Sequence, residues 1–398
     1  MTDLRADPNA PLSDAPEPWT GSSTPSARSG PPWHMTEMIE AEPALARRIL
    51  ERHATSDGEA ARLAATIRGV AAGGGPIGVV GCGTSEHGAL GTADILRDAL
   101  RAAGLPSGPA MPLAIQALEF TLDPALGGLV IGVSHEGGTW AMNRALEAAR
   151  AAGAATALLT VGDRSPGAAL ADVVVATGEM DESWCHTIGY VSPLVAATAV
   201  AGHVSGQAVP IDDVVGLMAA GLACAAEAET IAGALHDASR IVVIGSGADR
   251  TAGRELVLKI EEATWLPSSY RDLETMLHGH LPATDATTGL VLILADRAGR
   301  DERVERAREL LEAASIIGIR SAAILVDGAS AVLETRLTPA GRIVVPGSPT
   351  LPAPVAALLG TAIPLQLLTE RLARARGTNP DPIRRGDERY RAAADRVR

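Results

Sequence analysis

Three charged residues, Glu255, Lys259 and Glu262, have the types and the spacing needed for acid–base chemistry. They are four and three residues apart in "ELVLKIEEATWLPSSYRDLETMLHGH" (255–280), so on a helix they share one face. Two interpretations are open. The charges could form a solvated face with i,i+4 pairing, or a catalytic face set among the leucines and isoleucines of the same segment.

Histidine and cysteine residues in two stretches of the sequence give weaker signals. His278 and His280 lie in the glycine-containing "LHGH", but two histidines at i,i+2 without nearby carboxylates are not a typical zinc motif, and we expect no metal. Cys185 and His186 are adjacent in "DESWCHTIGY" (181–190). Neighbouring side chains usually point apart, so we expect a buried cysteine rather than a nucleophile–base pair.

Two glycine turns, "GCGTSE" (81–86) and "SHEGGT" (134–139), each follow an apolar run and precede a helical pattern. Such a layout can bind an anion on free backbone N–H groups at a helix start. The alternative is a pair of ordinary turns in which Ser134 or Thr139 caps the next helix. The candidate binding residues in these turns are Thr84, Ser85, Ser134, His135, Glu136, Gly137 and Thr139.

A dinucleotide site is not expected, because the G-x-G-x-x-G fingerprint fails in both turns that resemble it. Glu86 stands in place of the third glycine in "GCGTSE", and Arg250 does so in "GSGADR".

The elements that must position these residues occur twice along the chain. Residues 77–100 and 240–263 both predict a strand, a glycine turn and a helix. Further strands are expected near 129–133, 155–161 and 172–177, and again near 290–295, 322–327 and 342–345. Alternating strands and helices predict an α/β fold with parallel sheets, which bind ligands at the carboxyl ends of their strands. We therefore expect two tandem domains, at 60–210 and 220–372.

The segments outside the two domains differ in composition. Residues 1–34 are rich in Pro, Ser, Asp and Gly, which predicts a disordered tail. Residues 35–59 predict an opening helix that is interrupted near Pro43, and residues 373–398 form a C-terminal tail.

The composition excludes several classes of protein. The formal net charge of −13 argues against a nucleic-acid surface. No run of about 20 apolar residues predicts a membrane span, and no apolar segment near the N-terminus predicts secretion, so we expect a cytoplasmic protein. The cysteines, Cys82, Cys185 and Cys224, are too scattered for a disulfide framework.

Taken in order, these motifs resemble the sugar isomerase (SIS) family, and in particular the isomerase half of glucosamine-6-phosphate synthase and the aminosugar-phosphate deaminases. The resemblance covers residues 35–385. "MTEMIEAEPALARRIL" is similar to the family's opening segment, "GCGTSE" to its C-G-T-S turn and "SHEGGT" to its phosphate loop. "ELVLKIEE" followed by "LHGH" resembles its catalytic helix and His-Gly turn.

The resemblance implies roles for single residues. Glu262 would move a proton between C1 and C2 of an open-chain sugar, and Lys259 and Glu255 would support it. His278 would open the sugar ring, reaching the site from the neighbouring subunit. The hydroxyls expected to contact phosphate or sugar are those of Ser85, Ser134, Thr139 and Thr187.

The resemblance also implies an assembly and a chemistry. The fold would be two tandem SIS-type three-layer domains with parallel sheets, assembled as a homodimer. Aldose–ketose interconversion abstracts a proton next to a carbonyl, which needs a positioned base and a group at the ring oxygen. It requires neither a metal nor an organic cofactor.

Several residues depart from the family pattern. Glu136 stands where the phosphate loop has a serine, and two like charges about 4 Å apart repel by about 4 kcal/mol at an effective dielectric near 20. Either Glu136 points away, or a protonated His135 compensates it, or the ligand is not a phosphate. Arg384 and Arg385 stand near the place of a catalytic lysine, and an arginine cannot form a Schiff base but can clamp an anion. Thr2 follows Met1, so we expect no glutaminase activity.

Three hypotheses follow. The first is an aldose–ketose isomerase or deaminase acting on an aminosugar or sugar phosphate. The second is a non-catalytic sugar-phosphate-binding protein, and the third is an isomerase of an unphosphorylated sugar derivative.

Overall fold

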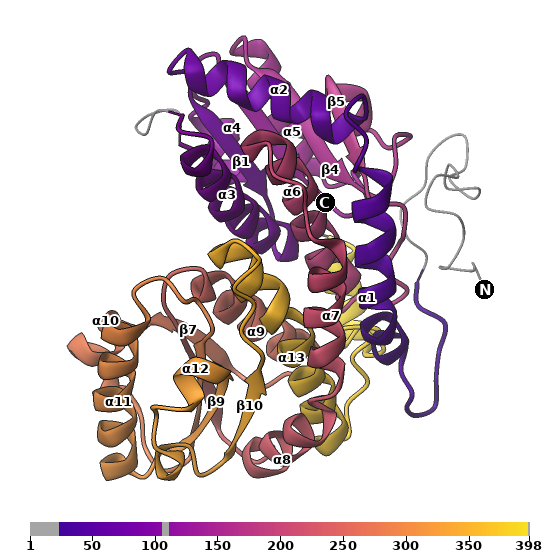
Figure 1. Ribbon diagram of the computed structural model, residues 1–398. Coiled ribbons are helices and arrows are strands. Elements are labelled where there is room, and N and C mark those ends of the chain that lie inside the picture. The colour runs from indigo at the N-terminus through magenta and orange to yellow at the C-terminus, as the bar shows by residue number, and fades with distance from the viewer. Residues whose placement is uncertain (1–23, 106–110, 397–398) are drawn as a thin grey trace.

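The protein is built around two five-stranded parallel sheets, which occupy separate halves of the chain (Figure 1). The computed structural model describes residues 24–105 and 111–396. The strands of the first sheet are β1 (Ile77–Gly81), β2 (Leu113–Gln116), β3 (Leu129–Val133), β4 (Ala155–Thr160) and β5 (Val173–Ala176). Those of the second are β6 (Arg240–Gly245), β7 (Ser268–Asp272), β8 (Thr288–Leu294), β9 (Arg320–Val326) and β10 (Gly341–Val345).

The strand order is the same in both sheets. The first sheet runs β2-β1-β3-β4-β5, and the second, taken from its β7 edge, runs β7-β6-β8-β9-β10. All pairs are parallel. The expected repeat is therefore confirmed, and so is the α/β fold with two parallel sheets. The central strands are fully buried because helices cover both faces of each sheet.

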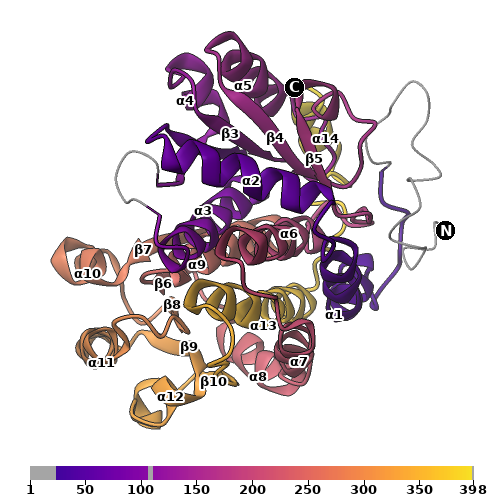
Figure 2. The same ribbon diagram turned by 45° about the horizontal axis from the view of Figure 1, so that its top comes forward.

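Helices fill the layers on either side of the sheets. The helices of the first half are α1 (His34–Arg52), α2 (Glu59–Ala72), α3 (Thr84–Ala102), α4 (Ala117–Leu122), α5 (Trp140–Ala151) and α6 (Ile188–Ser205). The longer helices of the second half are α7 (Ile211–Leu222), α8 (Ala225–Leu235), α9 (Asp249–Thr264), α11 (Arg300–Ile317), α13 (Ala353–Ala375) and α14 (Glu388–Ala394). Helices α3, α6, α9 and α13 lie between the two sheets (Figure 2), and α3 contacts α9 directly.

Two of these helices are long and apolar enough to cross a membrane, which the sequence interpretation did not foresee. They are α6 and α13, and 83% of each apolar window is buried inside the protein. Their apolar composition is explained by this burial between the two halves of the chain, since helices buried on all sides have no need of a polar face.

Helix α1 corrects one sequence expectation. It runs without a break from His34 to Arg52, so Pro43 lies inside the helix and does not interrupt it. The expectation of disorder falls mostly on residues 1–23, outside the described residues. Residues 24–33, by contrast, make specific contacts, since Arg28 forms an ion pair with Glu37 at 2.7 Å.

The C-terminal tail returns to the start of α1. Asp381 accepts hydrogen bonds from the backbone N–H groups of His34 and Met35, both at 3.0 Å, and so caps that helix. The backbone N–H of Trp184 donates to the Asp381 carbonyl oxygen at 3.0 Å. The tail therefore joins α1 to the segment that contains "DESWCH".

Candidate active site

The two glycine turns lie at the point where the first sheet reverses its strand order. β1 and β3 are neighbours, and the chain leaves them toward opposite edges, which is where open α/β sheets bind ligands. Gly81 ends β1 and permits a close backbone approach, because a Cβ atom there would lie 2.2 Å from the Ser85 carbonyl oxygen. Thr84 and Ser85 then begin α3, so "GCGTSE" is a strand-to-helix turn as expected.

The "SHEGGT" turn is held together by its own contacts. Ser134 is buried, and its hydroxyl accepts a hydrogen bond from the Gly137 N–H at 3.1 Å. Gly137 has a φ of +73°, and a Cβ atom there would lie 2.0 Å from the Ser165 hydroxyl oxygen, so the turn requires glycine. Thr139 is exposed and precedes α5 without a side-chain capping bond. The expectation that Ser134 or Thr139 caps α5 through its side chain is therefore wrong.

His135 turns into the protein and joins this turn to the next loop. Its Nε2 accepts a hydrogen bond from the Asp181 N–H at 2.9 Å. Burial, together with the nearby His186, lowers the pKa of His135 to about 4. His135 is therefore neutral at pH 7, and a protonated His135 does not compensate Glu136. Of the three alternatives for this loop, an outward Glu136 and a ligand without phosphate remain.

The loop after β5 is organised by Asp181, a residue that was quoted in the sequence motif but given no role. Its carboxylate accepts hydrogen bonds from the N–H groups of Thr187 at 3.0 Å and Gly189 at 2.7 Å, where α6 begins. Thr187 is fully buried, and its hydroxyl donates to Asp181 at 3.3 Å. In this conformation the Thr187 hydroxyl lies in the protein interior, bonded to Asp181.

His186 is the charged partner of Asp181. Their closest nitrogen and oxygen atoms are 3.4 Å apart. The Asp181 carboxylate raises the pKa of His186, and His186 together with backbone N–H groups lowers the pKa of Asp181. Burial acts against each of these two pKa shifts but does not reverse them. The pair is thus stabilised in its ionised form beside the neutral His135.

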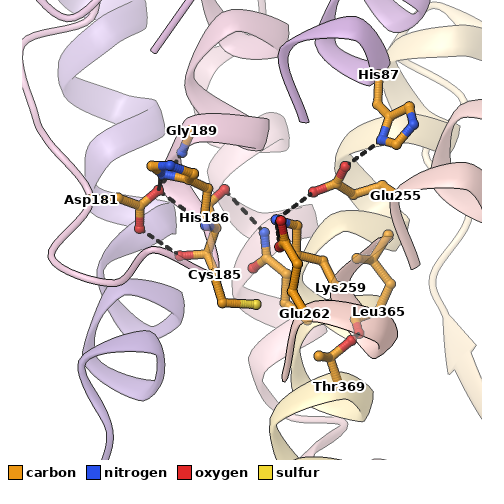
Figure 3. A network of polar contacts seen from close by, with 12 residues as sticks. His87, Asp181, Cys185, His186, Gly189, Glu255, Lys259, Glu262, Leu365 and Thr369 are labelled. Atoms are coloured by element: carbon orange, nitrogen blue, oxygen red, sulfur yellow. Dashed lines mark hydrogen bonds and ion pairs between the residues drawn. The ribbon is translucent and has the colours of Figure 1, made fainter. Parts of the chain in front are cut away.

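Helix α9 brings the three predicted charges into one chain of contacts (Figure 3). Lys259 is fully buried, and its Nζ lies 2.6 Å from a Glu262 oxygen and 3.7 Å from a Glu255 oxygen. The Glu262 side chain keeps 22% of its surface exposed, whereas that of Glu255 keeps 1%. The chain of charges therefore runs from the interior to an accessible carboxylate at Glu262.

Lys259 is also the only lysine among the 34 basic residues of the sequence, the rest being arginine. Burial alone would lower the pKa of Lys259. The Glu262 and Glu255 carboxylates outweigh this effect and raise the pKa above its ordinary value. The amine is thus held as an ammonium ion, which acts as a cation and not as a nucleophile. This single lysine was a signal in the sequence that the spacing argument did not use.

His87 of α3 is a second residue that sequence reasoning missed. Its Nδ1 lies 2.6 Å from the Glu255 carboxylate, and both side chains are largely buried (Figure 3). The contact joins the two halves of the chain, and His87 lies within one helical turn of Thr84 and Ser85. It therefore brings the "GCGTSE" turn against the charged face of α9, which no pattern within either segment could reveal.

Cys185 is buried, as expected, near the charges of α9. Burial raises the pKa of its thiol well above the usual value, so it is not a thiolate nucleophile.

His278 lies apart from this cluster. It lies in the turn Met276–His280, where the backbone of His278 and Gly279 is not helical, and its side chain is 69% exposed. Its Nε2 lies 2.7 Å from the Glu274 carboxylate. Within residues 24–105 and 111–396, no hydrogen bond or ion pair joins His278 to Glu262. One copy of the chain thus brings together Glu255, Lys259 and Glu262, but not His278.

The two C-terminal arginines stack on aromatic rings. The guanidinium of Arg384 lies 4.7 Å from the ring centre of Trp265, which follows the end of α9, and that of Arg385 lies 4.5 Å from Trp184. Arg384 has a positive φ of 66°. The tail thus holds two cations against the loop before Cys185 and the end of the helix that carries Glu262.

Two groups of side chains have potential metal-ligating atoms within 4.8 Å of one another. They are His135, Asp181 and His186, and His34, Glu37 and Glu182. In the first group, the His135 Nε2 and the Asp181 carboxylate already take part in hydrogen bonds. In the second, Glu37 pairs with Arg28 and His34 with Glu182. These sets fit mutual hydrogen bonding better than a metal ion.

The two prominent cavities lie elsewhere, on either side of the connection between the two halves of the chain. One has a volume of about 260 Å³ and lies between the ends of α3 and α6 and residues 349–355. The other has about 370 Å³ and lies between the ends of α1 and α6. Both are lined by residues 207–209, and neither reaches the glycine turns.

The equivalent edge of the second sheet is closed by acidic residues. In "GSGADR", the Asp249 carboxylate accepts hydrogen bonds from the N–H groups of Ala295 and Asp296, at 2.9 and 3.0 Å. Asp296 in turn forms an ion pair with Arg303 at 3.0 Å. Burial raises the pKa of Asp249 to about 7.

This buried carboxyl predicts a pH-dependent stability. The folded protein keeps the Asp249 proton up to about pH 7, whereas the unfolded chain releases it near the ordinary aspartate pKa of 3.8. The stabilisation is therefore complete below about pH 4 and is lost as the pH rises to about 7, at about 1.4 kcal/mol per pH unit. Urea unfolding of the wild type and Asp249→Asn across this range should show that slope in their difference. If the free energy of unfolding changes with pH in the same way in both proteins, the prediction is wrong.

No family model and no curated protein matches the sequence. Many solved structures are similar to it, among them the following three. The C-terminal domain of glucosamine-fructose-6-phosphate aminotransferase from Francisella tularensis has a TM-score of 0.74 at 17% identity, over 89% of this chain and 99% of that chain. The tagatose-6-phosphate ketose/aldose isomerase from Escherichia coli has a TM-score of 0.70 at 19% identity, over 91% of this chain and 98% of that one. The glucosamine-6-phosphate deaminase from Thermotoga maritima has a TM-score of 0.61 at 18% identity, over 87% and 96%.

These similarities confirm the expected fold. The chain has the tandem SIS-type fold of these phosphosugar isomerases and deaminases, and they cover nearly all of its described residues. At such identities the likeness establishes the architecture, and the reaction must be argued from the site.

Proposed function

We propose that the protein is an aldose–ketose isomerase or deaminase of an aminosugar or sugar phosphate, without a metal or cofactor, in the cytoplasm. The observation that carries this proposal is the chain of charges on α9, which ends in the accessible Glu262 carboxylate beside a buried ammonium ion. The named activities of the structurally similar proteins support the same class of reaction.

The geometry suits proton transfer next to a carbonyl group. Lys259 holds one Glu262 oxygen at 2.6 Å and so fixes the orientation of the carboxylate, which can take a proton from C2 and return it to C1. Glu255, itself held by His87, keeps Lys259 in place. A substrate bound at the carboxyl ends of β1 and β3 would lie beside Thr84 and Ser85, within reach of this helix.

Residues outside α9 bear on whether the substrate carries a phosphate. Glu136 lies in the turn where a phosphate would bind, and His135 is neutral and does not offset its charge. Arg384 lies on Trp265 at the end of α9, and Arg385 lies on Trp184 in the loop before Cys185. This arrangement favours either a phosphate held away from Glu136 or an unphosphorylated sugar derivative.

A non-catalytic sugar-phosphate-binding protein is the second candidate. The exposed position of His278, paired with Glu274, favours it, because one chain alone lacks the ring-opening group beside Glu262.

Proton exchange in D2O tests these alternatives. The protein is incubated with fructose 6-phosphate, glucosamine 6-phosphate and the two unphosphorylated sugars. NMR follows loss of the C2–H signal of the glucosamine compounds and of a C1–H signal of the fructose compounds, which have no hydrogen on C2. We expect exchange with at least one phosphorylated sugar. Exchange with the unphosphorylated sugars alone would establish the third hypothesis instead, and binding without exchange would establish the second.

We further propose a homodimer in which His278 of one copy completes the site of the other. Glu262→Gln and His278→Gln should each be inactive alone. Unfolding and refolding them together should restore about a quarter of the wild-type activity, because half of the dimers are hybrids and each hybrid has one intact site. Ultracentrifugation gives the oligomeric state. If hybrid dimers form but no activity returns, each active site takes its Glu262 and its His278 from the same subunit.

A further inference from the structure

Glu42 of α1 is a buried carboxyl group that the proposed chemistry does not use. Its side chain is fully buried, and among the described residues neither of its oxygens meets a hydrogen-bond donor in suitable geometry. A buried carboxylate without a partner is very costly, and such a group usually keeps its proton instead. Burial accordingly raises the pKa of Glu42 well above its usual value.

The polar group beside Glu42 is the side-chain amide of Gln366 on α13. Its Nε2 donates to the Thr187 carbonyl oxygen at 3.2 Å. Its Oε1 is buried and lacks a partner in the part of the chain that the structure describes. The Gln366 amide lies within hydrogen-bonding reach of the Glu42 carboxyl group, and neither Glu42 oxygen nor the Gln366 Oε1 has a partner among the described residues. An ionised carboxylate can only accept a hydrogen bond, so it cannot pair with that amide oxygen. One proton on Glu42 would satisfy a Glu42 oxygen and the Gln366 Oε1 together.

A neighbouring carboxyl group in the same helix interface shows the opposite arrangement. Glu370 is also fully buried between α1 and α13, but it accepts from Arg374 at 2.7 Å and from the Thr36 hydroxyl at 3.0 Å, and it pairs with Arg371. Glu370 is therefore compensated as an anion. Glu42 differs in that no cation of the described residues pairs with it.

We infer that Glu42 is a positioning residue that acts as a neutral acid, donating a hydrogen bond to Gln366 and thereby fixing the loop that contains Asp181, His186 and Thr187. The connection is continuous, because Gln366 holds the Thr187 carbonyl while the Thr187 N–H and hydroxyl hold Asp181. Helix α1 thus acts on a loop whose Cys185 lies near Lys259 and Glu262. The effect on catalysis rests on the proposed function, whereas the protonation state of Glu42 does not.

Infrared spectroscopy tests the protonation state directly. The wild type should show the C=O stretching band of a protonated carboxyl group at about pH 9, where Asp249, with a pKa of about 7, is ionised. The band should disappear in Glu42→Gln and remain in the matched control Glu370→Gln. Absence of the band in the wild type overturns the inference without any variant, and so does a band that survives Glu42→Gln.

Activity tests the positioning role. Glu42→Leu removes the donor and leaves Gln366 Oε1 buried and unpaired, so we expect about a tenfold lower kcat/KM, which corresponds to about 1.4 kcal/mol. Glu42→Gln, whose amide can donate to the same oxygen, should restore at least half of the wild-type value. Equal activity of Glu42→Leu and the wild type would refute positioning. If the wild type proves inactive, the proposed function fails, and the infrared result still decides the state of Glu42.

Discussion

Glu262→Gln is expected to abolish C2–H exchange, with a rate lower than that of the wild type by about a thousandfold, a typical contribution of a general base. The amide has the size of the carboxylate and can still lie beside Lys259, but it cannot accept the C2 proton. The loss should appear in kcat, with a much smaller change in KM, because the carboxylate is needed when the proton moves and not when the sugar binds. NMR exchange and steady-state kinetics measure the two quantities.

The adjacent carboxylate provides a matched control. Glu261 lies on the same helix but is exposed, and it accepts a hydrogen bond from the Ser268 N–H at 3.1 Å. Glu261→Gln makes the same chemical change one residue away and should keep exchange within about twofold of the wild type. If both variants retain exchange, Glu262 is not the base.

Most of the architecture could be predicted from the sequence because its central strands are buried on both faces. Such strands appear as continuous apolar runs, and the expected strand near 129–133 corresponds to β3, Leu129–Val133. The strands that were missed, β2 and β7, are partly exposed and lie second in each repeat. A half-exposed strand such as "SSYRD" has neither the apolar run nor a clear alternation.

The parts of the site that lie on one helix could be predicted from the sequence. The contacts that join different helices and loops could not. The spacing of Glu255, Lys259 and Glu262 placed them on one helix face, and α9 brings them into contact. The contact between His87 and Glu255 joins residues 168 positions apart, and no local pattern encodes it. The inward position of His135 depends on Asp181, and thus on how two loops meet.

Lys259→Met is expected to lower the free energy of unfolding by about 3–5 kcal/mol, because removing one partner from a buried charge cluster leaves the other charges uncompensated. Glu255 is buried, and on α9 it is the Lys259 ammonium that pairs with it. Methionine has nearly the volume of the lysine chain, so the loss reports charge rather than a cavity. Urea unfolding followed by circular dichroism measures it, and a loss below about 1 kcal/mol would show that Glu255 is compensated elsewhere.

Two further variants separate charge from shape at this position. The triple variant Glu255→Gln, Lys259→Met and Glu262→Gln removes every charge of the helix face, so it should recover much of the stability that Lys259→Met loses, though none of the activity. Lys259→Arg keeps the charge but places a larger, planar group in a fully buried space, and overpacking costs about 1–3 kcal/mol. In a chain that uses arginine at all its other basic positions, a destabilised and inactive Lys259→Arg would explain why its one lysine stands here. A fully active Lys259→Arg would mean that the site needs only a positive charge.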